Sequence, residues 1–295
     1  MAHLQHRRSQ NVAGDFYVDS SCIDCDTCRW LAPQIYSRVD SLSAVHRQPT
    51  EPSDRIAALE ALLACPTGYI GTPDTPKDIR FVQSRFPLQI DDNVFYCGYH
   101  SKISVVAASY FIQRPEGIFL IDSPRFTSPL VKQLEAMGVV HYLYLTHRDD
   151  VADHAKFHQH FGCERILHQQ DVTSSTSAVE IQPSGDEPFY LASDLAIIPQ
   201  PGHSAGHTVL LYKNKYLFTG DHLAWSARLS QPYAFRNFCW DSWPKQIESM
   251  KKLADYTQDY AFEWVLPGHG RRFSDSPVQM KQQMQQCILW MESVA

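Results

Sequence analysis

The chain has 295 residues, a length that suits about two domains. It is 44% apolar and 20% charged, as folded globular proteins are, and its net charge of −6 gives no reason to expect nucleic acid or an anionic membrane as a partner. No apolar run approaches the roughly 20 residues of a membrane span. Residues 1–16 are polar and lack the apolar segment of a signal peptide.

The eight cysteines are unevenly distributed. Cys22, Cys25 and Cys28 fall within seven residues, and Cys65 follows them. Clustered cysteines in a chain without a secretion signal indicate a metal site in a reducing compartment rather than disulfide bonds. We therefore expect a cytoplasmic protein, with the plastid stroma as an alternative. The other cysteines stand alone and are expected to be small buried apolar residues: Cys97, Cys163, Cys239 and Cys287.

The two-residue gaps between Cys22, Cys25 and Cys28 are those of an iron–sulfur motif, because they let three thiolates converge from one loop. Such a run usually continues with three residues, a fourth cysteine and a proline. Here Pro33 is present, but Ala32 stands before it. A fourth ligand would therefore have to come from another segment.

Residues 50–64 predict a helix that delivers this ligand. Thr50 can cap the helix and Pro52 suits its first turn. Its apolar residues recur at helical spacing: Ile56, Leu59, Leu62 and Leu63. The helix leads into Cys65, which Pro66 follows, so the missing cysteine–proline pair is supplied here. The sequence thus predicts one [4Fe–4S] cluster, bound by Cys22, Cys25, Cys28 and Cys65.

These motifs resemble those of single-cluster bacterial-type ferredoxins. The resemblance covers residues 14–85 and includes "FYVDSSCIDCDTC" and "ACPTGYIG". It implies a small α+β ferredoxin-like domain, which we place at residues 1–85. The alternative is a structural zinc site of four cysteines, although zinc ribbons normally show two separate CxxC pairs.

From residue 86 the chain contains both β-rich and helical segments. Strands are predicted over 104–112, 117–123, 141–147, 165–171 and 262–270, with a hairpin over 208–221. Helices are predicted over 125–138, 153–162 and 243–258. No repeat or low-complexity segment is present, and only residues 71–78, which contain proline and aspartate, suggest a linker.

Residues that can bind a metal fall where the predicted strands end. They are Asp122, His147, His203, Asp221 and His269. Loops beyond strand ends are where a rigid sheet presents side chains to a common site. A single histidine at such a position is more often structural than a ligand. Several such positions, most of them next to glycine or proline, indicate a metal centre.

Four motifs that carry these residues resemble the metal-binding motifs of the metallo-β-lactamase superfamily. They are "LYLTHRDDVADH", "PQPGHSAGH", "LFTGDHL" and "VLPGHG". The resemblance spans residues 86–295, which we take as the second domain. It implies an αβ/βα sandwich of the α/β class with a dinuclear metal centre at one edge, preceded by the small ferredoxin-like domain.

The resemblance also implies a set of ligands. One metal ion would be bound by His147, Asp149 and His203. The second would be bound by Asp153, His154 and His269, and Asp221 would bridge the two ions. Asp122 would lie behind the ligands and support them.

The first of these motifs departs from the HxHxDH pattern of the superfamily. A carboxylate replaces the second histidine, and two extra residues precede the Asp153–His154 pair. Asp149 is the expected ligand because it keeps the offset from His147, and Asp150 is its rival. A third reading is that the first ion has lost this ligand altogether.

The two resemblances together help to decide between a hydrolytic and a redox reaction. With two zinc ions, this superfamily activates water for hydrolysis. With two iron ions, it binds O₂, NO or a peroxide and needs electrons. Asp149 favours iron or manganese over zinc by ligand type, and a tethered cluster raises the local supply of electrons. We therefore expect a redox-active diiron oxidoreductase, for which flavodiiron proteins offer a partial analogy.

Two alternatives stand beside this interpretation. One is a zinc-dependent hydrolase with a structural or regulatory cluster, and the other is a non-enzymatic redox sensor. The expected partners are a small-molecule substrate or O₂/NO and an external electron donor, with no nucleic acid and no membrane. Electron transfer would need the cluster and the metal centre close together, within one chain or across a homodimer.

Overall fold

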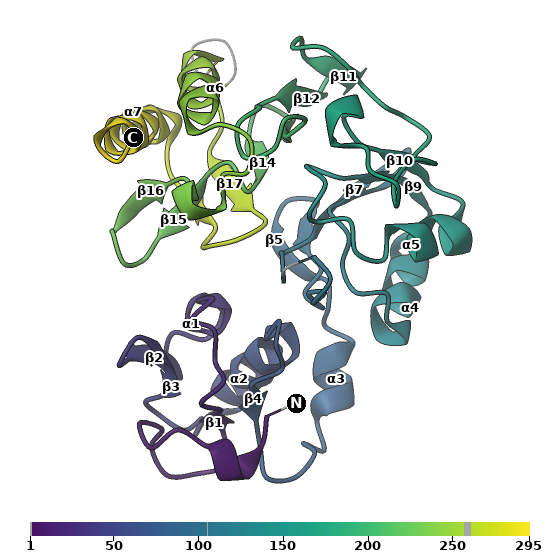
Figure 1. Ribbon diagram of the computed structural model, residues 1–295. Helices are drawn as coiled ribbons and strands as arrows, with labels where there is room; N and C mark the ends of the chain where they lie inside the picture. Colours follow the sequence, from purple (N-terminus) through teal and green to yellow (C-terminus); the bar gives the residue numbers. More distant parts are fainter. Residues whose placement is uncertain (1, 105, 257–260) are drawn as a thin grey trace. The chain divides into compact units, whose positions relative to one another are not determined.

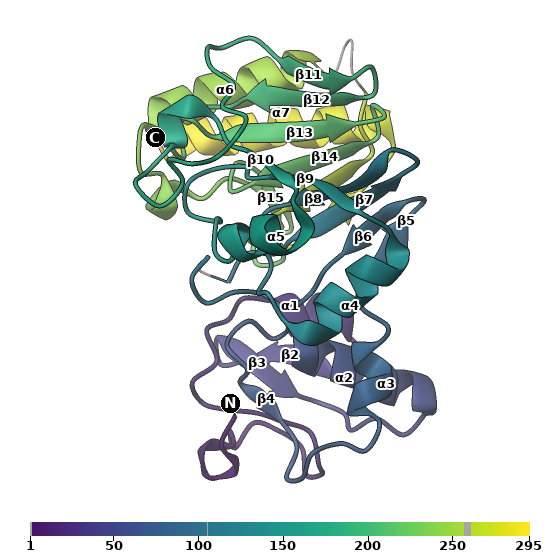
Figure 2. The same cartoon turned by 90° about the vertical axis from the view of Figure 1, so that its right-hand side faces the viewer.

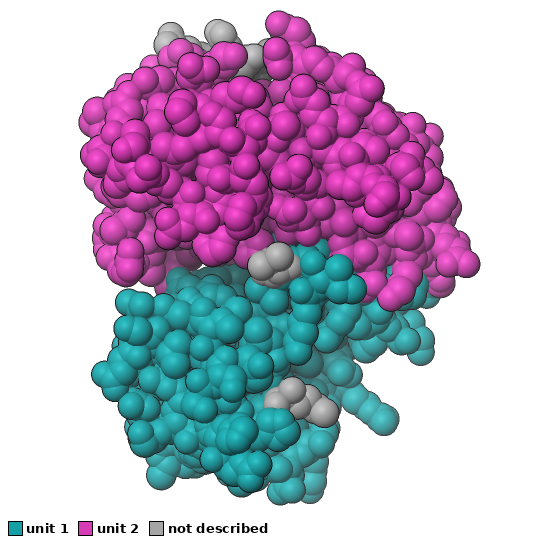
Figure 3. All heavy atoms as spheres, in the orientation of Figure 1, with its two compact units in different colours: residues 1–118, 124–139 teal, residues 119–123, 140–295 magenta. Residues whose placement is uncertain are grey.

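The computed structural model describes residues 2–104, 106–256 and 261–295 (Figure 1). The chain forms two compact units, which are coloured separately in Figure 3. Unit 1 comprises residues 1–118 and 124–139, and unit 2 comprises residues 119–123 and 140–295. The predicted boundary between residues 85 and 86 lies inside unit 1, and it stays a prediction.

The N-terminal segment of unit 1 is built from short elements around a small apolar core. Two antiparallel strand pairs are present: β1 (Tyr17–Val18) with β4 (Ile70–Gly71), and β2 (Tyr36–Val39) with β3 (Leu42–Val45). The helices are η1 (Leu4–His6), α1 (Thr27–Leu31) and α2 (Pro52–Ala64). The core between these elements contains Phe16, Ile35, Tyr36, Leu59 and Ile70, each at most 5% exposed.

Helix α2 confirms the helix predicted over residues 50–64. It begins at Pro52, and Glu51 rather than Thr50 occupies the N-cap position, without a side-chain capping bond. The helix ends at Cys65, whose backbone is extended. Because a proline disfavours helical geometry at the residue before it, Pro66 accounts for this end point. The helix terminus therefore sets the position of the Cys65 thiol.

The remainder of unit 1 contains α3 (Ile79–Gln83), α4 (Ser128–Met137) and three antiparallel strands. These strands are β5 (Leu88–Asp91), β6 (Val94–Tyr96) and β7 (Tyr110–Arg114). The β5–β6 hairpin was not predicted. The strand predicted over 104–112 overlaps β7 only from Tyr110 onward, and Val105 lies outside the described residues.

Unit 2 begins with the last three residues of β8 (Gly117–Ile121), a strand that the two units share. It continues with β9 (Val140–Tyr144), α5 (His154–Phe161) and β10 (Glu164–Ile166), followed by η2 (Gln169–Asp171). β9 and β10 are parallel neighbours. The strand order of the sheet is β10-β9-β8-β7-β6-β5.

The second sheet of unit 2 has six strands in the order β11-β12-β13-β14-β17-β18. They are β11 (Phe189–Ala192), β12 (Leu195–Pro199), β13 (Thr208–Tyr212), β14 (Tyr216–Gly220), β17 (Trp264–Pro267) and β18 (Phe273–Ser274). β14 and β17 are parallel, and the other pairs are antiparallel. The predicted hairpin over 208–221 is therefore confirmed as β13–β14. Further short elements are β15 (Ala224–Ser226), β16 (Gln231–Tyr233) and η3 (Arg236–Phe238).

Two helices cover one face of the second sheet, as Figure 2 shows for α6 (Trp243–Tyr256) and α7 (Pro277–Ser293). Leu211 and Leu217 of the sheet pack in one core with side chains of both helices. α6 was predicted, and residues 257–258 of that prediction lie outside the described residues. α7 was not predicted, although four of its residues form a buried stripe: Met280, Met284, Cys287 and Met291. No helix in the described part of the chain is long and apolar enough to cross a membrane.

Candidate functional site

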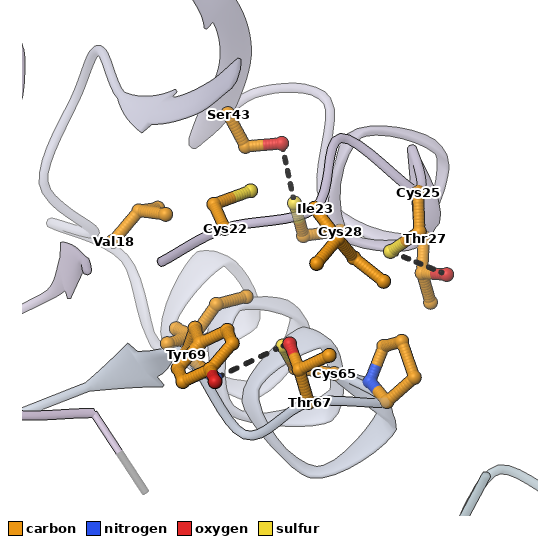
Figure 4. A pocket seen from close by; sticks show the side chains of 12 residues that line it. Val18, Cys22, Ile23, Cys25, Thr27, Cys28, Ser43, Cys65, Thr67 and Tyr69 are labelled. Atoms are coloured by element: carbon orange, nitrogen blue, oxygen red, sulfur yellow. Dashed lines mark hydrogen bonds between the residues drawn. The ribbon is translucent and has the colours of Figure 1, made fainter. Parts of the chain in front are cut away.

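The four clustered cysteines line one pocket in unit 1, shown in Figure 4. Cys22 and Cys25 lie in the loop after β1, Cys28 lies in α1, and Cys65 caps α2. None of the four is in a disulfide. The remaining walls are largely apolar, with Val18, Ile23, Pro66 and Ile70 among them. Four thiols around one apolar pocket fit the ligand shell of a [4Fe–4S] cluster.

Hydrogen-bonding groups lie beside three of these sulfurs. Sγ of Cys28 is 3.3 Å from Oγ of Ser43, and Sγ of Cys25 is 3.5 Å from Oγ1 of Thr27. The main-chain N–H of Tyr69 donates to Sγ of Cys65 over 3.3 Å. Burial raises the pKa of the Cys25 thiol to about 11 and raises that of Cys28 as well. Cluster binding must therefore release protons from these thiols.

A second candidate site lies in unit 2, where loops follow the strands of both sheets. His147 follows β9, His203 lies between β12 and β13, Asp221 follows β14, and His269 follows β17. Gly202 lets the chain turn beside His203, because its φ is +139° and a Cβ there would lie 2.4 Å from Cα of Gln246. The strand ends thus bring these side chains to one place, as the sequence pattern indicates.

His147, Asp149 and His203 form one group of converging ligand atoms. Oδ2 of Asp149 lies 3.9 Å from Nε2 of His147 and 3.6 Å from Nε2 of His203. The two imidazole rings are 4.6 Å apart, and both histidines are at most 1% exposed. Nε2 of each ring has no hydrogen-bond partner among the described residues. Buried, unpaired donor atoms that point to a common place fit a metal ion.

Asp150 joins His147 and Asp221 in a second group. Its Oδ2 is 3.9 Å from Nε2 of His147, and Oδ2 of Asp221 is 3.8 Å from the same atom. Asp150 is fully buried, and neither of its carboxylate oxygens has a hydrogen-bond partner among the described residues. A Cβ on Gly268 would lie 2.9 Å from Oδ2 of Asp150, so this glycine lets the chain pass against the carboxylate. His269, the next residue, is bonded through Nδ1 to Oδ1 of Asp221 over 2.6 Å.

Asp153 and His154 belong to neither group of ligand atoms among the described residues. Oδ1 of Asp153 accepts a hydrogen bond from Lys156 over 2.7 Å. Nδ1 of His154 accepts from Nη1 of Arg165 over 3.2 Å. The two residues form the start of α5, after a turn in which Ala152 has a φ of +24°. In this arrangement the pair contacts Lys156 and Arg165.

The electrostatics of the site suit a cation. The pKa of Asp150 is raised well above its ordinary value, mainly because the carboxyl group is buried and secondly because the negative charge of Asp221 is close. The pKa of His147 is lowered to about 4, mainly because the imidazole is buried and secondly because His203 is its neighbour. His203 in turn lowers the pKa of Asp149. A divalent ion binds neutral imidazoles and ionised carboxylates. Its positive charge would offset the repulsion between neighbouring carboxylates at this site.

Asp122 lies behind the ligands. It accepts hydrogen bonds from the main-chain N–H of Thr146 over 2.8 Å and from its hydroxyl over 2.9 Å. That hydroxyl is 2.9 Å from Nδ1 of His147, which leaves Nε2 facing the site. His207 supports Asp221 in a similar way. Its Nε2 accepts a hydrogen bond from the main-chain N–H of Asp221 over 3.3 Å. Both residues therefore position candidate ligands: Asp122 positions His147 through Thr146, and His207 positions Asp221.

Asp171 of η2 was not found from the sequence. Its side chain is fully buried. Oδ2 accepts from the main-chain N–H of Arg148 over 3.0 Å and from the hydroxyl of Ser204 over 2.5 Å, and Oδ1 accepts from the N–H of Gly206 over 2.8 Å. One carboxylate therefore ties the loop that carries His147 to the loop that carries His203.

We expect Asp171→Asn to weaken metal binding by about 10–100-fold, the range typical when a group that orients ligands is lost. An amide has one acceptor oxygen instead of two, so its N–H groups would face at least one of the three N–H or O–H donors and the loops would separate. Competition with a chelator measures the affinity, and Asp171→Asn is compared with Asp186→Asn, which changes an exposed carboxylate. Equal affinities in the two variants would contradict this role.

The family described as "4Fe-4S single cluster domain of Ferredoxin I" matches residues 18–72, a span that contains all four clustered cysteines. No curated protein matches the chain.

Metallo-β-lactamases are among the solved structures similar to this chain. DIM-1 metallo-beta-lactamase exposed to ceftazidime is 15% identical, with a TM-score of 0.56 over 70% of this chain and 96% of that chain. VMB-1 at pH 5.5 is 17% identical, with a TM-score of 0.51 over 70% of this chain and 96% of that chain. The metallo-beta-lactamase from Hirschia baltica is 13% identical, with a TM-score of 0.50 over 69% of this chain and 95% of that chain. At these identities the likeness concerns the fold alone.

Proposed function

We propose that this chain, which joins a single-cluster [4Fe–4S] ferredoxin domain to a metallo-β-lactamase fold, is a diiron oxidoreductase supplied with electrons by its own cluster. The observation that carries the proposal is the ligand chemistry of the site. Asp149, Asp150 and Asp221 place three carboxylates beside His147 and His203. The expected substrate is a small oxidant such as O₂ or NO.

The donor atoms favour iron over zinc. His147, His203 and Asp149 form a two-histidine, one-carboxylate set, a combination that non-haem iron sites use with open positions for a substrate. Zinc sites prefer thiolate and imidazole ligands, whereas carboxylates suit harder ions. The exchange of an imidazole for Asp149 thus moves the first site toward iron or manganese.

We assign Asp150 to a second ion, which it would hold together with His269, and Asp221 would be a ligand that the two ions share. Its carboxylate is buried and unpaired, and it lies against Gly268, which precedes His269. This set replaces Asp153 and His154, whose side chains are engaged by Lys156 and Arg165. When bound, the two ions supply redox and Lewis-acid chemistry.

The chain's own residues position these groups. Thr146 and Asp122 engage Nδ1 of His147 so that Nε2 would be available to an ion, and Asp171 holds together the loops that carry His147 and His203. The cluster domain supports a redox reaction because hydrolysis consumes no electrons. Covalent tethering raises the effective concentration of such a donor.

A zinc-dependent hydrolase with a structural cluster is the second candidate. It is favoured by the paired imidazoles of His147 and His203, which also suit zinc. The two candidates differ in metal content.

Metal analysis and Mössbauer spectroscopy of protein purified without oxygen test the proposal. We expect about six irons per chain, of which four belong to the cluster and two to unit 2. A Cys65→Ser variant should lose cluster iron and keep the two irons of unit 2, which separates the two sites. Four irons with two zinc ions, persisting in protein made in iron-rich medium, would favour the hydrolase.

A further inference from the structure

Ser43 lines the cluster pocket, and its hydroxyl contacts one of the four cysteines. It lies in β3, it is 1% exposed, and its Oγ is 3.3 Å from Sγ of Cys28 (Figure 4). Two threonines lie near other cysteines at longer distances, with Thr27 at 3.5 Å from Cys25 and Thr67 at 3.7 Å from Cys65. Ser43 therefore offers the closest hydroxyl to any of the four sulfurs among the described residues.

A charged donor orients the Ser43 hydroxyl. Nη1 of Arg29 donates to Oγ of Ser43 over 2.6 Å. Arg29 is itself held by two carboxylates, because Nη1 donates to Asp24 over 2.7 Å and Nε donates to Asp26 over 2.6 Å. The guanidinium is 9% exposed and cannot accept a hydrogen bond. The hydroxyl proton of Ser43 is therefore free to point elsewhere.

The main chain of Ser43 is fixed as well. Its carbonyl accepts from Nη1 of Arg8 over 2.5 Å, and its strand pairs with Arg38 of β2. With a metal-free thiol, Cys28 is the donor to Ser43. With a cluster bound, Cys28 is a thiolate that can only accept, so the hydrogen bond must reverse and Ser43 must donate.

We propose that Ser43 donates a hydrogen bond to the Cys28 thiolate and thereby raises the reduction potential of the cluster. Adding one electron to the cluster increases the negative charge on its sulfurs. No covalent bond forms or breaks, and the hydrogen bond from Ser43 becomes stronger. A donor stabilises the more negative, reduced state more than the oxidised state, so reduction becomes easier. Arg29 keeps the hydroxyl aligned. The proposal rests on the cluster domain and not on the reaction in unit 2.

A redox titration of the full, cluster-loaded chain, followed by electron paramagnetic resonance, tests the proposal. The matched pair is Ser43→Thr and Ser43→Val, because the two side chains have similar shapes, both suit a strand, and only threonine has a hydroxyl. We expect the midpoint potential of Ser43→Val to be lower than that of the wild type, and that of Ser43→Thr to stay close to it. Ser53→Ala, which changes an exposed serine of α2, is the control for an unrelated hydroxyl.

Equal potentials for the two variants, with four irons and four sulfides retained in each, would overturn the proposal. Ser43→Ala removes the hydroxyl without adding volume to this buried site, and a midpoint potential equal to that of the wild type in this variant would also overturn the proposal.

Discussion

A Cys65→Ser variant is expected to lose the intact four-iron cluster and, with it, most of the broad visible absorption of the protein. Cys65 lines the same pocket as Cys22, Cys25 and Cys28, and the end of α2 places its thiol there. A serine hydroxyl is a poor replacement for a thiolate, so about four irons should fall to a three-iron form or to none. Iron and sulfide analysis with absorption spectra measures the loss.

Cys97→Ser is the matched control for this variant. Cys97 is also a free cysteine and is fully buried, but it does not line the pocket. We expect it to retain the full cluster. A full cluster in Cys65→Ser combined with a lost cluster in Cys97→Ser would show that the assignment of the fourth ligand is mistaken.

Asp150→Asn is expected to remove one metal ion from unit 2. The Asp150 carboxylate is buried without a hydrogen-bond partner in the described part of the chain, and its Oδ2 is 3.9 Å from Nε2 of His147. Loss of a direct ligand should lower the affinity for that ion at least as much as the roughly 10–100-fold seen when a supporting group is lost. Metal analysis after dialysis against a weak chelator measures the effect.

Asp153→Asn makes the corresponding change a few residues along the same loop. Because the Asp153 carboxylate pairs with Lys156, we expect normal metal content in this variant. The reverse pattern, with metal lost from Asp153→Asn and retained in Asp150→Asn, would restore the ligand set that the family resemblance implies.

The sequence motifs predicted both folds because each motif places residues that can bind a metal at a fixed spacing, in most cases beside a glycine or proline that shapes the backbone. Cys65 could be paired with the distant cysteine run since a helix and a proline define its position. The β13–β14 hairpin was predictable because apolar runs flank Asn214, whose φ of +47° suits a turn. Helix α7 was missed, although Met280, Met284, Cys287 and Met291 form a stripe with helical spacing among polar glutamines.

The details of the metal site depend on contacts that no local pattern encodes. The sequence offered Asp149 and Asp150 as rivals for one position, whereas the structure places both near His147. The path of the loop after β9 decides this, and it brings both carboxylates within 4 Å of the same imidazole nitrogen. Asp171 acts through hydrogen bonds to residues more than 20 positions away, so its neighbours in the sequence give no signal.

The rate at which a reduced cluster is reoxidised tests the redox function most directly. Full-length protein would be reduced by one electron per cluster without oxygen, mixed with O₂ or NO, and followed by its visible absorption. We compare the wild type with His203→Ala, which removes a ligand that we propose for the first ion, and with His141→Ala, which changes an exposed histidine of β9. The account predicts fast reoxidation in the wild type and His141→Ala and slow reoxidation in His203→Ala. Equal rates in all three proteins would mean that the cluster reacts with the oxidant by itself, and would contradict a diiron oxidoreductase fed by its own ferredoxin domain.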